Sequence, residues 1–515
     1  MFKYAQMVIV LLTQSILRIT CKDFMDLLDS LIFGFSTLIG WKPILVIITG
    51  VIVGIMVGAM PGLSPSTGVA LLVPFSYTMS PALAVILLVS IYISSNYGGS
   101  ITAVLINTPG TPAAAATALD GYPLTLKGEA GKGLGFSLIA STIGGIFGVI
   151  ILILFAVPLA KLAIGFHPAD YFALAVFGLT TVGSLGKGNV AKAMVAVLFG
   201  LLINTVGIDP ISGVSRFTFG IDQLYDGFSL IPALIGLFAL SVVFTALEEG
   251  KLGSRVVEKV SGKFPTLPET WKLKYTIMRS SVLGTIIGVF PGAGATIASF
   301  ISYNLAQRSS KEPETFGSGA VEGVVASEAA NSSSVGGALI PLLALGIPGS
   351  ATDAVLIGAL QLHDITPGPL LFESNPEIVY GIFSSLLIAN AVMLFLGFYG
   401  VRLFAKVVEV PTSILYPMIL AIALIGSFAV QNSFFDVGSC IGFGLVGWIF
   451  KRYNYPVAPV VLGIVLGNLL EENFRRAVMM DGPMVFFTEP LSLTMLTVAA
   501  LLFALPIYRK YKSKA

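Results

Sequence analysis

The chain has 515 residues, of which 55% are hydrophobic and 11% are charged, and its formal net charge is +2. Soluble domains carry about 25% charged residues, so this composition excludes a soluble globular protein. The nearly balanced charge and the lack of a basic helix argue against a nucleic-acid partner. Nearly uncharged runs long enough to cross a bilayer recur at 133–160, 228–247, 378–400 and 491–507. We therefore expect an all-α polytopic membrane protein with about 10–13 membrane segments.

Two Pro-Gly pairs interrupt apolar runs in the first half of the chain, and two more do so in the second half in the same order. Pro61-Gly62 corresponds to Pro291-Gly292, and Pro109-Gly110 corresponds to Pro348-Gly349, with a similar spacing between the copies in both cases. A helix loses backbone hydrogen bonds at Pro-Gly. Within hydrocarbon, protein, water or ligand must satisfy those groups. Paired broken segments at matching positions indicate a transporter binding site.

The self-similarity extends beyond the breaks. An apolar run from Pro168 to Gly183-Ser184 matches one from Pro411 to Gly426-Ser427, and the offset is the same at both ends of the run. A fixed spacing of this kind indicates two copies of one unit, clearest over 43–247 and 278–470. The predicted organisation is an N-terminal extension at 1–24, repeat 1 at 25–247, a cytoplasmic linker at 248–277, repeat 2 at 278–470, and a C-terminal loop with the last membrane helix at 471–515.

The basic loops indicate how the two copies are oriented. Loop 120–133 contains Lys127 and Lys132, whereas its counterpart at 361–377 has neither Lys nor Arg. Basic loops face the cytoplasm. Loops that carry Lys or Arg in one copy and lack both in the other therefore favour two inverted-topology repeats. The Arg475-Arg476 pair fits this pattern less well.

The breaks predict the form of the broken segments. Residues 277–307 suit a re-entrant hairpin with limbs of about 20 Å, neither able to cross about 30 Å of hydrocarbon. Residues 43–78 would be its mirror partner, and 81–118 and 322–360 are interpreted as discontinuous spans. Helices that begin after these breaks point free N–H groups toward the membrane interior, where they favour an anion.

Four glycine-rich stretches resemble the large membrane subunit of the tripartite tricarboxylate transporters, the TctA family: PGLSPSTGVALLVPF, NYGGSITAVLINTPGTPAAAATALDGYPL, GVFPGAGATIASFISY and EGVVASEAANSSSVGGALIPLLALGIPGSATDAVLIGAL. The resemblance runs from about Met25 to the C terminus. It implies a multi-pass protein of the bacterial inner membrane that works with a small TctB-like membrane subunit and a periplasmic TctC-like solute-binding protein. It also implies secondary uptake of a carboxylate such as citrate, driven by sodium ions or protons, with no cofactor.

Members of this family typically begin where Met25 stands, so residues 1–24 are either an extra membrane segment or the result of a start placed too early. The family pattern after Glu328-Ala329-Ala330 usually has two asparagines. Here Asn331 is followed by three serines, of which Ser332 is the first. Hydroxyls therefore replace an amide among the expected ligands.

The residues at the breaks are the candidates for substrate binding: Pro61, Gly62, Asn107, Thr108, Pro109, Gly110, Thr111, Pro291, Gly292, Pro348, Gly349 and Ser350. Hydroxyls and amides at a broken tip suit a carboxylate, although they also cap new helices. Glu328, Asn331 and Ser332 are the candidates for ion coupling, because an ionisable residue in a span is costly and usually functional. The alternatives are a Glu328–Arg279 pair at the end of the span and helix–helix hydrogen bonding by the small polar residues. Glu322 and Asp353 are weaker candidates.

No catalytic or metal-binding motif stands out. The sequence has no Gly-x-Ser-x-Gly, no His-Glu-x-x-His and no P-loop, and neither His167 nor His363 has further ligands in a metal spacing. Cys21 and Cys440 are isolated. A membrane channel remains an alternative function, because broken helices also build selectivity filters, and a membrane-embedded enzyme is a less favoured one.

Overall fold

The computed structural model describes residues 21–60, 62–185, 190–249, 263–292, 294–407 and 410–512. These residues are almost entirely helical, and they include a single two-stranded antiparallel sheet in which Gly207 pairs with Arg216 and Ile208 with Ser215. Seven described helices are long and apolar enough to cross a membrane, and four shorter apolar helices accompany them. The expected all-α, multi-pass architecture is thus confirmed.

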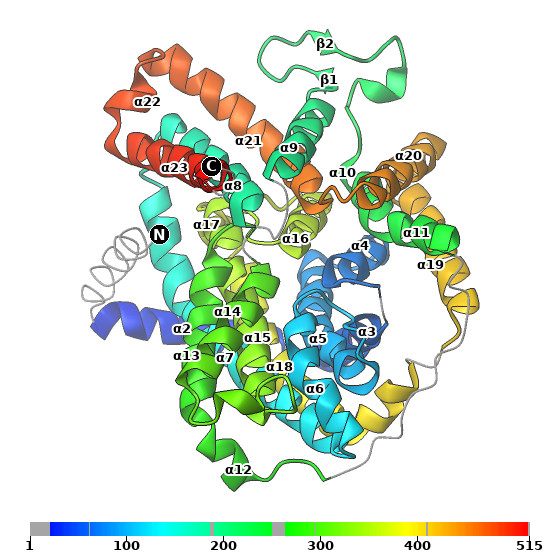
Figure 1. Cartoon of the computed structure of the whole chain (residues 1–515). Helices are drawn as coiled ribbons and strands as arrows, with labels where there is room; N and C mark the ends of the chain where they lie inside the picture. Colours follow the sequence, from blue (N-terminus) through cyan, green and yellow to red (C-terminus); the bar gives the residue numbers. More distant parts are fainter. Residues whose placement is uncertain are drawn as a thin grey trace.

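The first half of the chain is drawn from blue to green in Figure 1. Its elements in order are α2 (Cys21–Thr37), α3 (Trp41–Ala59), α4 (Pro65–Ser76), α5 (Pro81–Ile106), α6 (Ala114–Leu126), α7 (Ala130–Ala163), α8 (Pro168–Leu185), α9 (Val190–Asn204), β1 (Gly207–Ile208), β2 (Ser215–Arg216), η1 (Asp222–Leu224), α10 (Leu230–Ile235), η2 (Gly236–Leu240) and α11 (Ser241–Glu249). The predicted extension at 1–24 lies outside the described residues except for its last four, where α2 begins.

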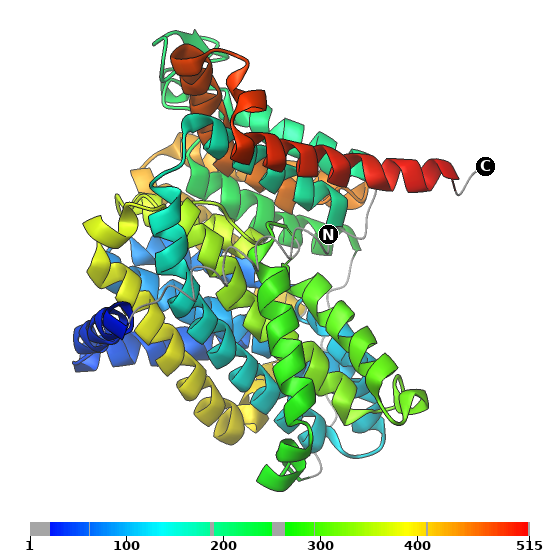
Figure 2. The ribbon, with the colours of Figure 1, turned by 90° about the vertical axis from the view of Figure 1, so that its left-hand side faces the viewer.

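The second half runs from green to red (Figure 1). It comprises α12 (Leu267–Lys272), α13 (Lys274–Val289), α14 (Gly294–Ser309), η3 (Pro313–Thr315), α15 (Val321–Leu345), α16 (Ala351–Leu362), α17 (Leu371–Ser374), α18 (Pro376–Val407), α19 (Thr412–Gln431), α20 (Phe434–Arg452), α21 (Ala458–Asp481), α22 (Val485–Thr488) and α23 (Pro490–Lys512). The middle of the predicted linker, 250–262, lies outside the described residues. Figure 2 shows the C-terminal end of α23 projecting from the body of the molecule.

Each Pro-Gly break separates two helices, as predicted from sequence. The breaks lie between α3 and α4, α5 and α6, α13 and α14, and α15 and α16. Other glycines in these helices do not interrupt them, because they serve close packing. A Cβ atom on Gly58 of α3, for example, would lie 2.1 Å from the carbonyl oxygen of Ser95 in α5.

The helix that precedes the first break is longer in the first half than in the second, and the re-entrant form of both segments stays a prediction. α13 and α14 have 16 residues each, or about 24 Å. α3 has 19 residues, is strongly apolar and is long enough to cross a membrane by itself. α5, with 26 residues, is also long enough before its break. Small polar residues such as Ser90 and Ser94 do not end this helix, because each hydroxyl donates to a carbonyl of the preceding turn.

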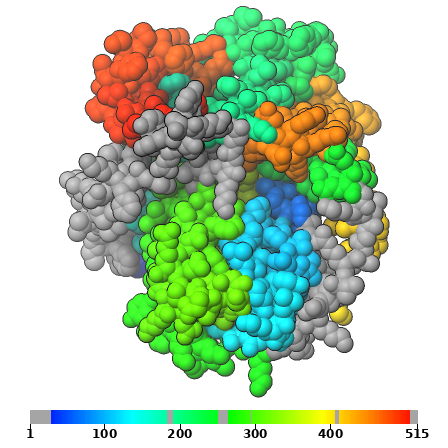
Figure 3. All heavy atoms as spheres, in the orientation of Figure 1, coloured from blue at the N-terminus to red at the C-terminus, as the bar shows by residue number. Residues whose placement is uncertain are grey.

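The helices form two groups in Figure 1. α3, α5 to α7, α13 to α15 and α18 occupy the lower part, while α8 to α11 and α19 to α23 occupy the upper part. Within the lower group, α7 packs against α15 and α18 packs against α5. Figure 3 shows the cyan segment of α6 beside the green segment that contains α14, and these two helices are in contact.

A network of ion pairs fixes the loop between α9 and α10 to α21. Arg475 contacts Asp209 at 2.8 Å and Glu471 at 2.7 Å, and Arg216 of β2 contacts Glu471 at 2.7 Å. Arg476 pairs with Glu472 at 3.0 Å. The two arginines that fitted the basic-loop pattern poorly are therefore neutralised by neighbouring carboxylates.

Candidate functional site

The first break has the same backbone form in both halves. Met60 and Phe290, which directly precede the two prolines, are both extended, with φ/ψ of −88°/116° and −82°/120°. Gly62 and Gly292, which directly follow the prolines, both have positive φ values, 91° and 75°, a conformation that glycine adopts without steric cost. Pro61 lies outside the described residues. The repeated backbone geometry at equivalent positions explains why a Pro-Gly pair occurs twice.

A serine caps the helix after the first break in the first half. Ser64 Oγ accepts a hydrogen bond from the Thr67 N–H at 3.2 Å and lies 2.7 Å from Ser66 Oγ. This satisfies one of the free donors of the α4 N terminus. In the second half, Thr181 Oγ1 of α8 donates to the Pro291 carbonyl at 2.6 Å.

The second break also repeats. Asn107 after α5 and Gly346 after α15 occupy equivalent positions before the break, and both are left-handed, with φ of 51° and 71°. The Ala114 N–H donates to Thr111 Oγ1 at 3.3 Å, and the Asp353 N–H donates to Ser350 Oγ at 3.2 Å. Ser350 is therefore the N-cap of α16, whereas Thr111 lies two residues before the N-cap of α6, Ala113, and accepts from the first N–H of that helix. Capping does not exclude contact with a ligand, since each hydroxyl can form a further hydrogen bond.

The two kinds of break differ in how much room surrounds them. A Cβ atom on Gly110 would lie 1.9 Å from the Gly58 carbonyl oxygen, and one on Gly349 would lie 2.8 Å from Ala338. The corresponding atom on Gly62 would meet only Val242, at 4.0 Å. The second breaks are thus closely packed, whereas the first break of the first half adjoins open space.

The structure brings some of the candidate residues together. The Gly292 N–H donates to the Gly349 carbonyl at 2.9 Å, so the two breaks of the second half meet. Both second breaks also contact α5: the Gly110 N–H donates to the Gly99 carbonyl at 3.1 Å, and Ser350 Oγ lies 2.9 Å from Tyr92 Oη. These two contacts are two helical turns apart on α5, or about 10 Å along its axis.

The remaining break residues extend the same sites. Thr108 Oγ1 donates to the Ile106 carbonyl at 3.2 Å, which fixes the turn after α5. Asn107 is exposed, Pro109 is half-buried and Pro348 is buried. The first half therefore presents a more accessible polar break than the second.

Glu328 is fully buried and is held by two hydroxyls from the first half of the chain. Ser141 Oγ of α7 donates to it at 2.8 Å, and Thr117 Oγ1 of α6 donates to its other oxygen. Thr117 also contacts Ser327 at 3.0 Å. The salt bridges of the described residues do not include a Glu328–Arg279 pair, so the alternative of a paired structural charge gains no support.

The other two ion-coupling candidates carry polar atoms without partners. Asn331 Nδ2 donates to the Asn96 carbonyl of α5 at 3.4 Å. Asn331 Oδ1 and Ser332 Oγ are buried and have no hydrogen-bond partner within the described residues. Buried polar atoms are normally satisfied, so these two oxygens are available to a bound cation. Hard cations prefer such oxygen ligands.

Asp353 was a weak candidate from sequence, and the structure gives it greater weight. It is the third residue of α16, its side chain is fully buried, and neither carboxylate oxygen has a hydrogen-bond partner among the described residues. The sequence signal that pointed to it was an acid in the first turn after a break. Sequence alone could not tell whether that turn was exposed.

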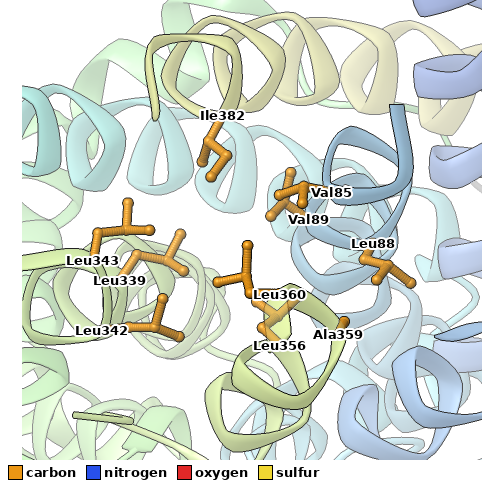
Figure 4. A pocket seen from close by; sticks show the side chains of 10 residues that line it. All are labelled: Val85, Leu88, Val89, Leu339, Leu342, Leu343, Leu356, Ala359, Leu360 and Ile382. Carbon is orange, nitrogen blue, oxygen red and sulfur yellow. The ribbon is translucent and has the colours of Figure 1, made fainter. Parts of the chain in front are cut away.

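A small cavity between α5, α15, α16 and α18 does not suit a carboxylate. Figure 4 shows its lining, which is entirely aliphatic and includes Val89, Leu339, Leu360 and Ile382. Its volume is about 10 Å³, room for about one water molecule. An apolar space of this size stays dry, so it is a packing defect between helices and not a ligand site.

The described part of the chain contains no group of three or more His, Cys, Asp and Glu residues that could hold a metal ion. His363 lies at the end of α16 and approaches Ser76 Oγ at 3.4 Å, and burial lowers its pKa.

Comparison with known proteins identifies the family. The model of the tripartite tricarboxylate transporter TctA family matches residues 44–462. The chain belongs to the TctA family. This makes it a component of a tricarboxylate transport system in a membrane, and the family resemblance seen in the sequence is confirmed.

Two proteins of Agrobacterium vitis are similar to this TctA-family chain. One, described as an uncharacterized 52.8 kDa protein in the TAR-I ttuC' 3'region, is 37% identical over 492 residues, which cover 95% of this chain and 98% of the relative. The other, described as an uncharacterized protein in the TAR-II ttuC' 3'region, is 38% identical over 233 residues, or 45% of this chain and 96% of the relative. No solved structure matches.

Proposed function

We propose that this protein is the permease subunit of a secondary transporter for tricarboxylates or related organic acids. It depends on a solute-binding protein and is driven by a sodium or proton gradient. The observation that carries the proposal is the pair of second breaks on α5. There Gly110 contacts Gly99 and Ser350 contacts Tyr92, so the breaks before α6 and α16, from opposite halves of the chain, both lie against α5. Helix N termini at such a site favour an anionic substrate.

The carboxylate substrate binds where the breaks offer hydroxyls, amides and free N–H groups. The first break of the first half is more open than the second breaks, since Gly62 is exposed and a Cβ atom there would meet only Val242, at 4.0 Å. Ser64 and Thr111 can each donate a hydroxyl proton toward a substrate oxygen while they accept from a backbone N–H of the following helix. The packed second breaks hold the helix ends in place and give the site its shape.

We further propose that the two halves are inverted-topology repeats. Gly54 packs against Ser94 and Ile91, and Gly284 packs against Ser333 and Ala330, which are the equivalent residues when the breaks of the two halves are aligned. Helices are also exchanged reciprocally between the halves, since α7 packs against α15 and its counterpart α18 packs against α5. Reciprocal exchange is what a pseudo-twofold axis between two copies produces.

The proposed orientation places the linker and the basic loops in the cytoplasm of a bacterium, with the protein in the inner membrane. Lys127 at the end of α6 is exposed, as a cytoplasmic loop residue should be. A TctB-like small membrane subunit and a TctC-like periplasmic solute-binding protein complete the transporter. The TctC-like solute-binding protein carries most of the substrate selectivity.

Glu328 is the proposed coupling residue, with Asn331 and Ser332 as further ligands of a sodium ion or as neighbours of a proton site. Support comes from the full burial of the carboxylate and from the unpartnered oxygens beside it. An anionic substrate that enters the membrane interior requires a compensating cation. A buried carboxylate that binds the cation first would supply that compensation.

Reconstitution of all three components in proteoliposomes tests this function. Uptake of di-, tri- and aromatic carboxylates is measured with and without an imposed sodium or proton gradient. We expect at least one carboxylate to accumulate above its outside concentration, and only when the binding protein and a gradient are present. Equilibration without accumulation would instead identify a channel.

A further inference from the structure

Asp353 lies in a place where a lone negative charge is costly. Its side chain has no exposed surface, and both of its carboxylate oxygens are without a hydrogen-bond partner in the described residues. Burial of an unpaired carboxylate is strongly unfavourable. The residue therefore requires a positive charge that the protein itself does not supply.

Oxygen atoms from both halves of the chain surround this carboxylate. The hydroxyls of Tyr92 in α5 and of Ser350 lie beside it, and the two hydroxyl oxygens are 2.9 Å apart. The break at Gly349 directly precedes this turn of α16. A carboxylate with two neighbouring hydroxyls is a suitable ligand set for a hard monovalent cation and equally for a proton shared between oxygens.

Two hydrogen bonds join the surroundings of Glu328 to α5, the helix that also carries Tyr92. Asn331 lies beside Glu328 and donates to the Asn96 carbonyl at 3.4 Å. Asn96 Nδ2 in turn donates to the Tyr92 carbonyl at 3.1 Å, one turn away on α5. The surroundings of both carboxylates thus meet on α5, where the Tyr92 ring separates the carbonyl on the Glu328 side from the hydroxyl on the Asp353 side.

The charged and titratable groups on the helices that pack against α16 offer no partner base. α4 and α10 carry none, α5 carries Tyr92 and Tyr97, and α15 carries Glu322 and Glu328. The arginines of α21 are paired with other acids, Arg475 with Asp209 and Glu471 and Arg476 with Glu472. His363 lies at the far end of α16 itself, about 15 Å along the helix axis.

Helix capping alone does not account for an aspartate here. A negative charge in the first turn stabilises a helix, but that benefit does not require the carboxylate to be fully buried. Ser350 already caps the helix. An asparagine at position 353 would retain the shape and the polar interactions of the cap, so Asp353→Asn separates the two roles.

We propose that Asp353 is a second cation-binding residue, which takes up H⁺ or Na⁺ in addition to the ion bound at Glu328, so that one transport cycle uses two monovalent cations. The proposal rests on the function proposed above. It assigns one half of the molecule two coupling sites that both adjoin α5.

Cation binding is tested first without transport. The thermal unfolding temperature of the purified full-length chain is measured against NaCl, with choline chloride to hold the ionic strength constant, and separately against pH. A bound cation raises this temperature. We expect Asp353→Asn and Glu328→Gln each to remove part of the rise, the double variant to remove all of it, and Glu322→Gln to leave it unchanged. Glu322 is the matched control because Thr276 Oγ1 donates to it at 2.7 Å near the start of α15.

Uptake by the three-component transporter gives the second test. The parent should depend on the driving cation with a Hill coefficient that approaches about 2, and Asp353→Asn should lower it to about 1. Tyr92→Phe keeps the carboxylate and should weaken cation dependence several-fold without abolishing it. Asp353→Glu, which retains a carboxylate, should show part of the cation dependence that Asp353→Asn loses. If the unfolding temperature rises with NaCl, the bound ion is sodium. If it changes only with pH, the bound ion is a proton.

The outcomes are distinguishable. If Asp353→Asn retains the full thermal shift and an unchanged Hill coefficient, while the parent accumulates substrate, the second site is wrong and the proposed function stands. If the parent accumulates no substrate yet Asp353→Asn removes part of the thermal shift, the transport function is wrong and the cation site stands. A loss of folded Asp353→Asn protein is resolved by Tyr92→Phe, for which an unchanged cation dependence would contradict the proposal.

Discussion

The two halves of this chain share a packing pattern but differ in chemistry. A Cβ atom on Gly54 would lie 2.0 Å from Ser94 Oγ, and one on Gly284 would lie 2.2 Å from the equivalent Ser333 Oγ. The buried acids have no such equivalents: when the second breaks are aligned, Val89 stands opposite Glu328 and Ala114 opposite Asp353. The comparison teaches that close helix contacts are needed in both copies, whereas the two acids proposed to bind cations, Glu328 and Asp353, occur only in the second copy.

The halves also differ in their surroundings. α4 packs against α10 and α19, and α16 packs against α10 and α21. Their counterparts α14 and α6 have no comparable packing against the upper group of helices among the described residues. Two copies of one unit in different environments are expected if a transporter alternates between two states and the copies exchange their roles.

Neutralising the charge of the second half should have the largest effect. We expect Glu328→Gln to abolish gradient-driven accumulation while exchange of substrate across the membrane persists, because the amide keeps the shape but not the charge. Uptake against an imposed gradient measures this, with Glu322→Gln as the control. Accumulation by Glu328→Gln as steep as that of the parent would make Glu328 a structural charge.

The second-largest effect on transport should come from bulky residues at the closely packed second breaks. Gly110→Val and Gly349→Val should both abolish transport. The loss of folded protein should be greater for Gly110→Val, because its Cβ meets the rigid Gly58 carbonyl at 1.9 Å. Overpacking of this kind costs about 1–3 kcal/mol or more. Size-exclusion profiles of the solubilised protein report folding. Normal uptake by both variants would show that the second breaks are not part of the substrate site.

The contact between α4 and α19 has no equivalent in the second half among the described residues, and a disulfide across it should block transport reversibly. A Cβ atom on Gly426 of α19 would lie 3.2 Å from Pro74 Cβ of α4, close to the separation in a disulfide. The double variant Pro74→Cys/Gly426→Cys should lose uptake on oxidation and regain it on reduction, whereas each single variant should be insensitive. Full uptake by the cross-linked protein would mean that α4 does not leave α19.

The smallest effect should come from the loop between α9 and α10. The backbone N–H groups of Ser212 and Ile211, together with Arg475, hold the pKa of Asp209 below its usual value. Because the folded pKa is depressed, the stabilisation is present above the ordinary carboxyl pKa of about 3.9 and is lost as pH falls below it. Asp209→Asn should therefore speed hydrogen exchange in residues 207–229 at pH 7, and Asp222→Asn should not. Equal exchange in parent and Asp209→Asn would contradict this.

Sequence predicted what local chemistry dictates. Pro-Gly pairs end helices wherever they stand, so the four breaks and the positions of Gly62 and Gly292 followed directly. The packing of α3 did not follow, because the residues that meet its glycines belong to α5 and are distant in sequence. For the same reason, the sequence could not predict that Thr117 and Ser141 donate hydrogen bonds to Glu328. These two residues belong to helices of the first half, far from Glu328 in sequence.

The claim that the two halves are inverted copies is tested most directly by the sidedness of two matched positions. Lys127 at the end of α6 and Gln361 near the end of α16 are both exposed. Single cysteines are placed at each in a background without Cys21 and Cys440, and intact cells are treated with a membrane-impermeant thiol reagent. Gln361→Cys should react from outside and Lys127→Cys only after the membrane is opened. Labelling of both from the same side would contradict the inverted arrangement.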